Sequence, residues 1–88
     1  MYKHLLLCIH VTNRIKNAPE LQVLFTQYGA NIKTRLGLHE VTDKIDSPAA
    51  VMVLEMVGDE DRFNELAGKV GAIEGVDVQK VVFSHETN

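Results

Sequence analysis

Cys8 and His10 are the two residues whose types and spacing come closest to a metal site. Residues two apart on a strand share a face of the sheet, so a thiolate and an imidazole placed in this way can chelate zinc, nickel or copper. His4 lies on the same face further back, and Glu55 and His85 would join it if the register of the neighbouring strands allows. The alternative is that Cys8 is a small apolar side chain and that the histidines lie near water at the strand ends.

A second group of residues could bind an anion or another small molecule. Asn13 and Arg14 lie in the predicted loop after the first strand, and Asn17 opens the predicted first helix, whose N-terminal N–H groups attract anions. Arg35 and His39 share a face of the predicted second strand and would complete this site across a dimer interface. The alternative is that these are solvated loop and edge-strand residues, where charge discourages unwanted strand pairing.

No arrangement typical of catalysis is found in the sequence. It contains no nucleophile with a neighbouring base, no pair of carboxylates in an apolar setting and no phosphate-binding loop. We therefore predict a protein without enzymatic activity, and the sequence leaves the identity of any cofactor unknown.

Two stretches of the chain share one order of elements: an apolar strand, a capped amphipathic helix, a turn containing glycine and a second strand. The predicted strands are residues 3–12, 32–41, 50–57 and 76–83, and residues 42–48 form a hairpin loop. Such a duplicated unit predicts an α+β fold, a ferredoxin-like βαββαβ sandwich, in a single domain of residues 1–88. The antiparallel sheet is predicted to have the strand order 4-1-3-2 and to carry both helices on one face.

The two helices are predicted from their caps and their apolar stripes. The first begins at Asn17 as N-cap with Glu20 as its capping-box partner, and it ends at Gly29. The second begins at Asp59 as N-cap. The stripes are Leu21, Leu24, Phe25 and Tyr28 in the first helix and Phe63, Leu66, Ala67 and Val70 in the second.

Three glycines interrupt the predicted elements. Gly37 lies inside the second strand, where glycine most often marks a bulge or a close backbone approach. Gly68 and Gly71 weaken the second helix, and we expect them to let it lie tightly on the sheet.

Composition excludes several classes of protein. The chain has 88 residues, a net charge of -3 and a pI near 5.7, and its nine Lys and Arg residues form no cluster that would bind nucleic acid. No apolar run approaches the roughly 20 residues of a membrane span, and the N-terminal stretch lacks the cleavage site of a signal peptide. A single cysteine is typical of a reducing compartment, so we expect a cytoplasmic protein without a membrane partner.

The predicted sheet leaves one face without a covering element. Leu5, Leu7, Ile9 and Val11 of the first strand should face the helices, whereas Leu6 and Cys8, with an apolar set from the third strand, should face the open side. Hydrophobic residues make up 45% of the chain, more than one sheet face and two helix stripes need. A second copy could bury the surplus, either by stacking sheet on sheet or by pairing edge strands, so we predict a homodimer or homotetramer.

The stretch NAPELQVLFTQYGANI resembles the pattern of ACT domains, in which a helix opens with Asp-x-Pro-Gly-x-Leu and ends in Gly-x-Asn-Ile. The segments RLGLH and LAGKVGAIEGVDVQKVVFS are similar to the small ACT-like proteins of the iron-only hydrogenase system regulator family. This resemblance implies a ferredoxin-like domain for ligand sensing or assembly, without catalytic activity. One residue departs from it, because Glu20 stands where amino-acid-binding ACT domains have glycine, and its carboxylate would repel the carboxylate of a ligand.

We therefore predict a small, self-associating regulatory module that responds to a small-molecule effector. One alternative is a metal-binding protein that uses Cys8 and His10. Another is a structural interaction module without a small ligand.

Overall fold

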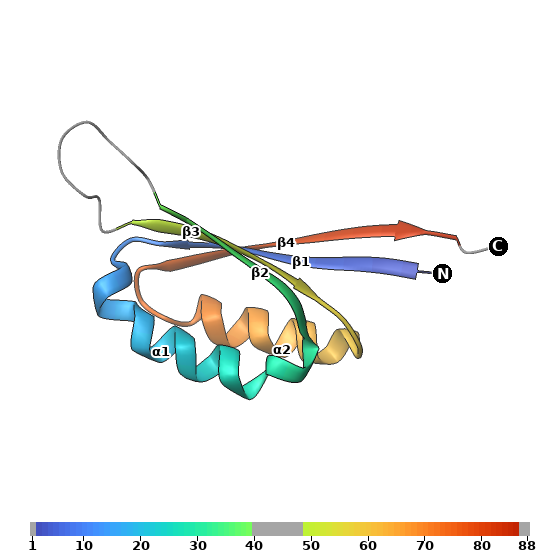
Figure 1. The fold of residues 1–88 in the computed structure, drawn as a ribbon, viewed down its shortest axis with the longest axis horizontal. Coiled ribbons are helices and arrows are strands. Elements are labelled where there is room, and N and C mark those ends of the chain that lie inside the picture. Colours follow the sequence, from blue (N-terminus) through green and yellow to red (C-terminus); the bar gives the residue numbers. More distant parts are fainter. Residues whose placement is uncertain (1, 40–48, 87–88) are drawn as a thin grey trace.

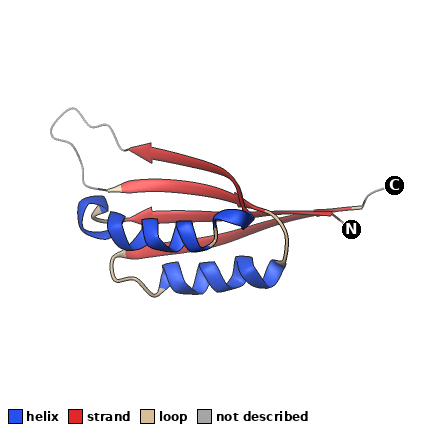
Figure 2. Ribbon diagram, turned by 60° about the horizontal axis from the view of Figure 1, so that its bottom comes forward, coloured by secondary structure: helices blue, strands red, loops and turns tan. Residues whose placement is uncertain are grey.

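The computed structural model describes residues 2–39 and 49–86, so the predicted hairpin loop lies outside the described residues. The elements are β1 (Tyr2–Val11), α1 (Arg14–Gln27), the short 3₁₀ helix η1 (Gly29–Asn31), β2 (Ile32–His39), β3 (Ala50–Met56), α2 (Glu60–Gly71) and β4 (Val76–His85). All paired strands are antiparallel, in the order β2-β3-β1-β4. This is the predicted order read from the opposite edge, and both helices cover one face (Figures 1 and 2), so the ferredoxin-like fold is confirmed.

Alternation along β1 sets the two faces of the sheet. Leu5, Leu7, Ile9 and Val11 are buried under the helices, as predicted. The intervening side chains of His4, Leu6, Cys8 and His10 are half-buried or exposed on the other face. Because β1 lies between β3 and β4, its apolar residues form the centre of the core.

The start of α1 differs from the prediction. Asn13, and not Asn17, is the N-cap, and its Oδ1 accepts a hydrogen bond from the Lys16 backbone N–H at 3.2 Å. The next turn closes when the Asn17 N–H donates to the Asn13 carbonyl at 3.0 Å, so the helix is already formed before Pro19. The prediction of Asn17 as cap was therefore wrong by one helical turn.

The predicted apolar stripes are confirmed in both helices. Leu21, Phe25 and Tyr28 are buried and Leu24 packs against the same core, while all four residues predicted for α2 are buried. Asp59 caps α2, because its Oδ1 accepts from the Asp61 N–H at 2.9 Å. The first helix ends at Gln27, two residues before Gly29, and Gly29 begins the single turn of η1.

The glycines behave differently from the prediction. The register irregularity in β2 lies between Ile32 and Thr34, whereas Gly37 pairs regularly with Met52, so the predicted bulge is not at Gly37. A Cβ added to Gly68 would meet nothing within 4 Å, and one added to Gly71 would meet only Val78 at 3.9 Å. The expectation that these two glycines let α2 lie tightly on the sheet is therefore not met.

Candidate anion-binding cavity

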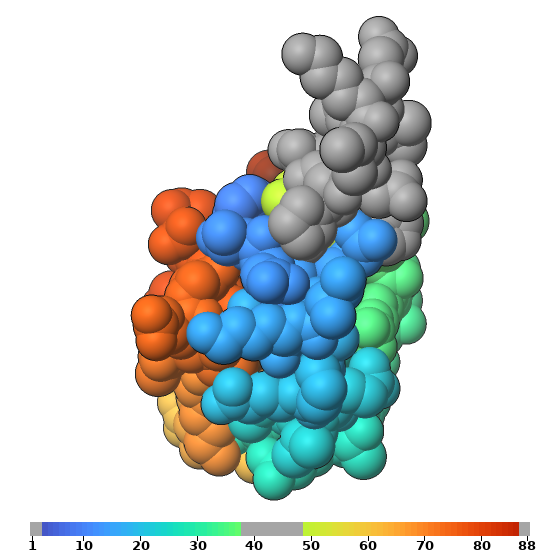
Figure 3. All heavy atoms as spheres, turned by 90° about the vertical axis from the view of Figure 1, so that its left-hand side faces the viewer, coloured from blue at the N-terminus to red at the C-terminus, as the bar shows by residue number. Residues whose placement is uncertain are grey.

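A cavity of about 230 Å³ lies between α1 and the β2–β3 pair of the sheet. Its floor is apolar and consists of buried or half-buried side chains from β1, α1 and β3, namely Val11, Leu21, Phe25, Ala50 and Met52. Its rim is polar and carries Arg14, Gln22 and Arg35. Figure 3 looks at the end of the molecule where α1 begins, with α1 in blue to cyan beside β2 in green.

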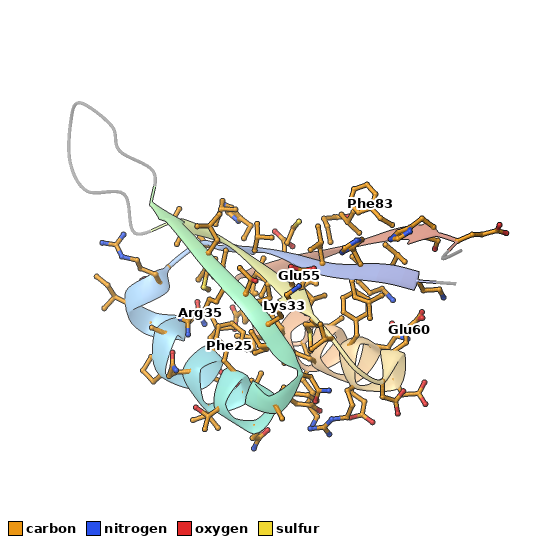
Figure 4. The ribbon with its side chains drawn as sticks, turned by 45° about the vertical axis from the view of Figure 1, so that its right-hand side comes forward. Phe25, Lys33, Arg35, Glu55, Glu60 and Phe83 are labelled. Atoms are coloured by element: carbon orange, nitrogen blue, oxygen red, sulfur yellow. The ribbon has the colours of Figure 1, made fainter. Side chains whose placement is uncertain are left out.

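Arg35 reaches from β2 toward α1 and is held there by two contacts. Its Nη1 donates to Gln22 Oε1 at 3.1 Å, and its guanidinium carbon lies 4.9 Å from the centre of the Phe25 ring. The pair Arg35 and Phe25 is seen between β2 and α1 in Figure 4. The guanidinium is therefore positioned at the mouth of the cavity, above an aromatic floor.

The second cation, Arg14, is the first residue of α1. The first turn of this helix contains no acidic residue, and it carries Lys16 as well as Arg14. Cations near a helix N-terminus oppose the helix dipole. The second helix has the usual arrangement instead, with Glu60 and Asp61 in its first turn. The N-terminal end of α1 is therefore a region of positive potential that suits an anion.

Within residues 2–39 and 49–86, none of the residues that line the cavity is acidic. Two guanidinium groups and one amide thus surround a space whose floor is apolar. This combination suits a small anion with an apolar part, because the guanidinium plane pairs with a carboxylate or phosphate while the floor contacts carbon.

The structure brings together two of the five predicted ligand residues, Arg14 and Arg35. Asn13 caps α1 and does not line the cavity. Asn17 is buried and its Nδ2 donates to the Glu74 carbonyl at 3.4 Å, so it ties α1 to the turn before β4. His39 ends β2 opposite Ala50, and its side chain lies outside the described residues.

Several residues of the cavity were not predicted from the sequence. Gln22 had no motif to mark it, and Phe25 and Met52 were expected only as core and strand residues. Gly37 was marked in the sequence as a glycine inside a strand, but only the structure shows that it lines a cavity. Glu20, expected to repel a ligand, is exposed on α1 and is not among the lining residues.

The predicted metal ligands lie on the open face of the sheet. Cys8 is opposite Val53 and Gln79, and His10 is opposite Val51 and Asp77. Within residues 2–39 and 49–86, no group of three or more His, Cys, Asp or Glu is arranged to hold a metal ion. The Cys8–His10 site therefore stays a prediction without further support.

Glu55 and His85 contact His4 and do not join Cys8 and His10. Glu55 Oε2 lies 3.2 Å from His4 Nδ1, and the rings of His4 and His85 stack with their centres 5.5 Å apart. Register and parity thus allow the predicted grouping, but at the end of the sheet where β1 begins and β4 ends.

The open face of the sheet carries a group of accessible apolar side chains among its polar residues. Leu36 is 55% exposed and Phe83 is 56% exposed, and the half-buried Leu6, Val53 and Val81 lie between them across β1, β3 and β4. Phe83 points away from the helices in Figure 4. We call these five residues the open-face patch. No helix in the described ranges has the length and apolarity needed to cross a membrane.

Comparison with known proteins adds the following findings. Residues 3–80 match the model of the TM1266-like family, described as "Iron-only hydrogenase system regulator, putative". The structure of the uncharacterized protein TM1266 from Thermotoga maritima is similar over 94% of this chain and 100% of its own, with a TM-score of 0.79 and 28% identity. The structure of CPII from Thiomonas intermedia K12, bound to ADP, AMP and acetate, is similar over 96% of this chain and 91% of its own. At a TM-score of 0.55 and 17% identity, that likeness concerns the fold alone. Among curated proteins, none matches the chain in sequence.

Proposed function

The chain belongs to the TM1266-like family, and from this premise we propose that it is a non-catalytic regulator that senses a small anion and self-associates through its sheet. The anion binds in the cavity between α1 and β2. The protein acts in the cytoplasm as a homodimer or homotetramer, without nucleic-acid or membrane partners. Its regulatory target belongs to an iron-only hydrogenase system, in line with the description of the family.

The observation that carries this proposal is the pairing of Arg14 with Arg35 above an apolar floor. An anion between the two guanidinium groups gains charge-assisted hydrogen bonds and lies at the positive end of the α1 dipole. Because Arg14 belongs to α1 and Arg35 to β2, the ligand stabilises the contact between these two elements.

Strand β2 can connect the ligand with self-association. Arg35 and Gly37 line the cavity, while Leu36 between them is exposed on the other face as part of the open-face patch. A ligand that fixes β2 therefore also fixes a residue of the proposed interface. Ligand binding and self-association would then both depend on the position of β2, and this shared dependence would couple their free energies.

A ligand-dependent melting screen tests the proposal. At constant ionic strength, small organic anions are expected to raise the midpoint of unfolding, whereas neutral and cationic compounds of the same size leave it unchanged. The Arg35→Gln variant should lose the shift. Absence of any shift with all compounds in the unmodified protein would contradict ligand sensing.

A structural interaction module without a small ligand is the second candidate, and the exposed open-face patch favours it. This candidate predicts self-association that no small molecule changes. Sedimentation with and without the anions that shift the melting midpoint separates the two functions. Metal analysis of the protein as purified tests the remaining alternative, binding at Cys8 and His10.

A further inference from the structure

The backbone conformation at Gly37 does not require a glycine. It pairs regularly with Met52, and the glycines with positive φ in the described part of the chain are Gly58 and Gly75. Any residue could therefore adopt its conformation, and larger residues are usually preferred inside a strand.

The space beside Gly37 is the cavity itself. Gly37 and Arg35 lie two residues apart on the same face of β2, and both line the cavity. A Cβ added at Gly37 would meet nothing within 4 Å. The missing side chain thus leaves open a space that the Cβ of an alanine would enter without a close contact, and the two methyl groups of a valine would occupy more of the same space.

The lining also limits the chemistry of the ligand. Each guanidinium presents N–H donors in a planar fork that matches a carboxylate. Among the described residues, no acidic side chain lines the cavity, so within this part of the chain the side-chain acceptor for the ammonium group of an amino acid is Gln22 Oε1, and Arg35 already donates to that oxygen. The floor offers only apolar contact to the rest of the ligand. The volume of about 230 Å³ is below the roughly 300–1000 Å³ typical of pockets for drug-sized ligands, so the apolar part is short.

We propose that the cavity selects a short-chain monocarboxylate without an ammonium group, and that Gly37 sets the chain length that is admitted. This inference rests on the function proposed above and deepens it. The carboxylate lies between Arg14 and Arg35, and the alkyl chain runs over Phe25 and Met52 beside Gly37.

Titration of the ¹⁵N-labelled protein with acetate, propionate, butyrate, valerate and hexanoate tests the ligand class. Affinity, followed through the amide signals of β2 at constant ionic strength, should rise about fourfold with each added methylene until the cavity is full, and then fall. The matching n-alkylamines and α-amino acids should bind at least tenfold more weakly than the carboxylate of equal length. A preference for inorganic phosphate, or for amino acids over alkanoates, would overturn the proposed class but leave ligand sensing intact.

The variants G37A and G37V test the role of Gly37. The best-bound alkanoate should become about one carbon shorter in G37A and about two carbons shorter in G37V, or binding should be lost in G37V. The melting midpoint of both variants should be at least that of the unmodified protein, because glycine is unfavourable inside a strand. An unchanged chain-length optimum in both variants would overturn the role of Gly37, even if alkanoates bind.

The matched control is Thr34→Ile, which adds bulk to the same strand on the open face of the sheet. It should leave the chain-length optimum where the unmodified protein has it. A shift in this control equal to that in G37V would show that strand rigidity, and not cavity size, selects the ligand. Absence of binding for every compound in the melting screen would remove the proposed function itself.

Discussion

The guanidinium carbon of Arg35 lies 4.9 Å from the centre of the Phe25 ring, and that ring is 4% exposed. Phe25 therefore has two surroundings, because it belongs to the hydrophobic core and its ring also lies under a cation at the mouth of the cavity. The ring quadrupole holds a guanidinium that lies above the aromatic face. Because the Arg35 side chain is already restricted in this way, it loses less conformational entropy when an anion binds. The two residues thus connect core packing with ligand binding.

Replacing Arg35 by Gln should weaken the binding of small carboxylates at least about tenfold, because hydrogen bonds to charged groups contribute about 1.5–3 kcal/mol. Stability should fall by less than about 1 kcal/mol, since Arg35 is exposed and its contact with Phe25 is of the weak surface kind. Titration and urea unfolding measure the two effects. The control is Lys33→Gln, an exposed cation on the same strand that does not line the cavity. Equal losses of affinity in both variants would point to overall charge and not to Arg35.

Replacing Phe25 by Ala should lower the free energy of unfolding by about 3–5 kcal/mol, because it removes a buried aromatic ring from the core. The matched control is Val23→Ala on the same helix, where the side chain is 58% exposed and the change should stay within about 0.5 kcal/mol. Chemical denaturation with a constant m-value gives both numbers. A loss below about 1 kcal/mol for Phe25 would contradict its place in the core.

Asn13 and Asn17 should differ in how they stabilise α1. Asn13→Ala removes the N-cap and should cost about 1 kcal/mol, since Lys16 loses the acceptor of its backbone N–H. Asn17→Ala leaves the buried end of the helix without its bond to the Glu74 carbonyl and should cost about 1–3 kcal/mol. Urea unfolding of the two single variants provides the comparison. If Asn13→Ala leaves the free energy of unfolding and the m-value unchanged, Asn13 is not the residue that caps the helix.

The strands and the buried stripes could be predicted because they depend on periodicity, which the sequence contains in full. Leu5, Leu7, Ile9 and Val11 alternate with the mixed set His4, Leu6, Cys8 and His10, and the structure buries the first set. The helix start could not be fixed in this way, because Asn13 and Asn17 are both good caps and Pro19 favoured the later one. The difference is decided by tertiary contact, because Asn17 is buried against the turn at Glu74, 57 residues further along the chain.

The sequence marked two of the charged side chains that line the candidate cavity, but it did not indicate the cavity itself. Arg14 and Arg35 were recognised because cations near a helix N-terminus and on an edge strand suggest an anion. The cavity between them depends on what is missing at Gly37, and a sequence does not say which neighbours surround a glycine. The contact of Arg62 with Tyr28, 4.1 Å from the ring centre, was missed for a related reason, because it joins two helices whose relative position no local pattern encodes.

The last prediction concerns self-association through the open-face patch. Leu36 is 55% exposed in the centre of β2, so Leu36→Lys should place a charge in the proposed interface and raise the dissociation constant at least about a hundredfold, in line with the cost of burying an unpaired charge. A charge at Leu6 would act on the same face, but Leu6 is half-buried beside Glu55, so a substitution at the more exposed Leu36 disturbs the monomer less.

The control is Val82→Lys, because Val82 is 42% exposed on the helix side of β4, and this variant should leave the assembly unchanged. Sedimentation at micromolar concentration measures all three chains. If the unmodified protein sediments as a monomer, the sheet-stacked assembly and its coupling to the ligand are both wrong; if the Leu36 and Val82 variants dissociate equally, the interface lies on another surface.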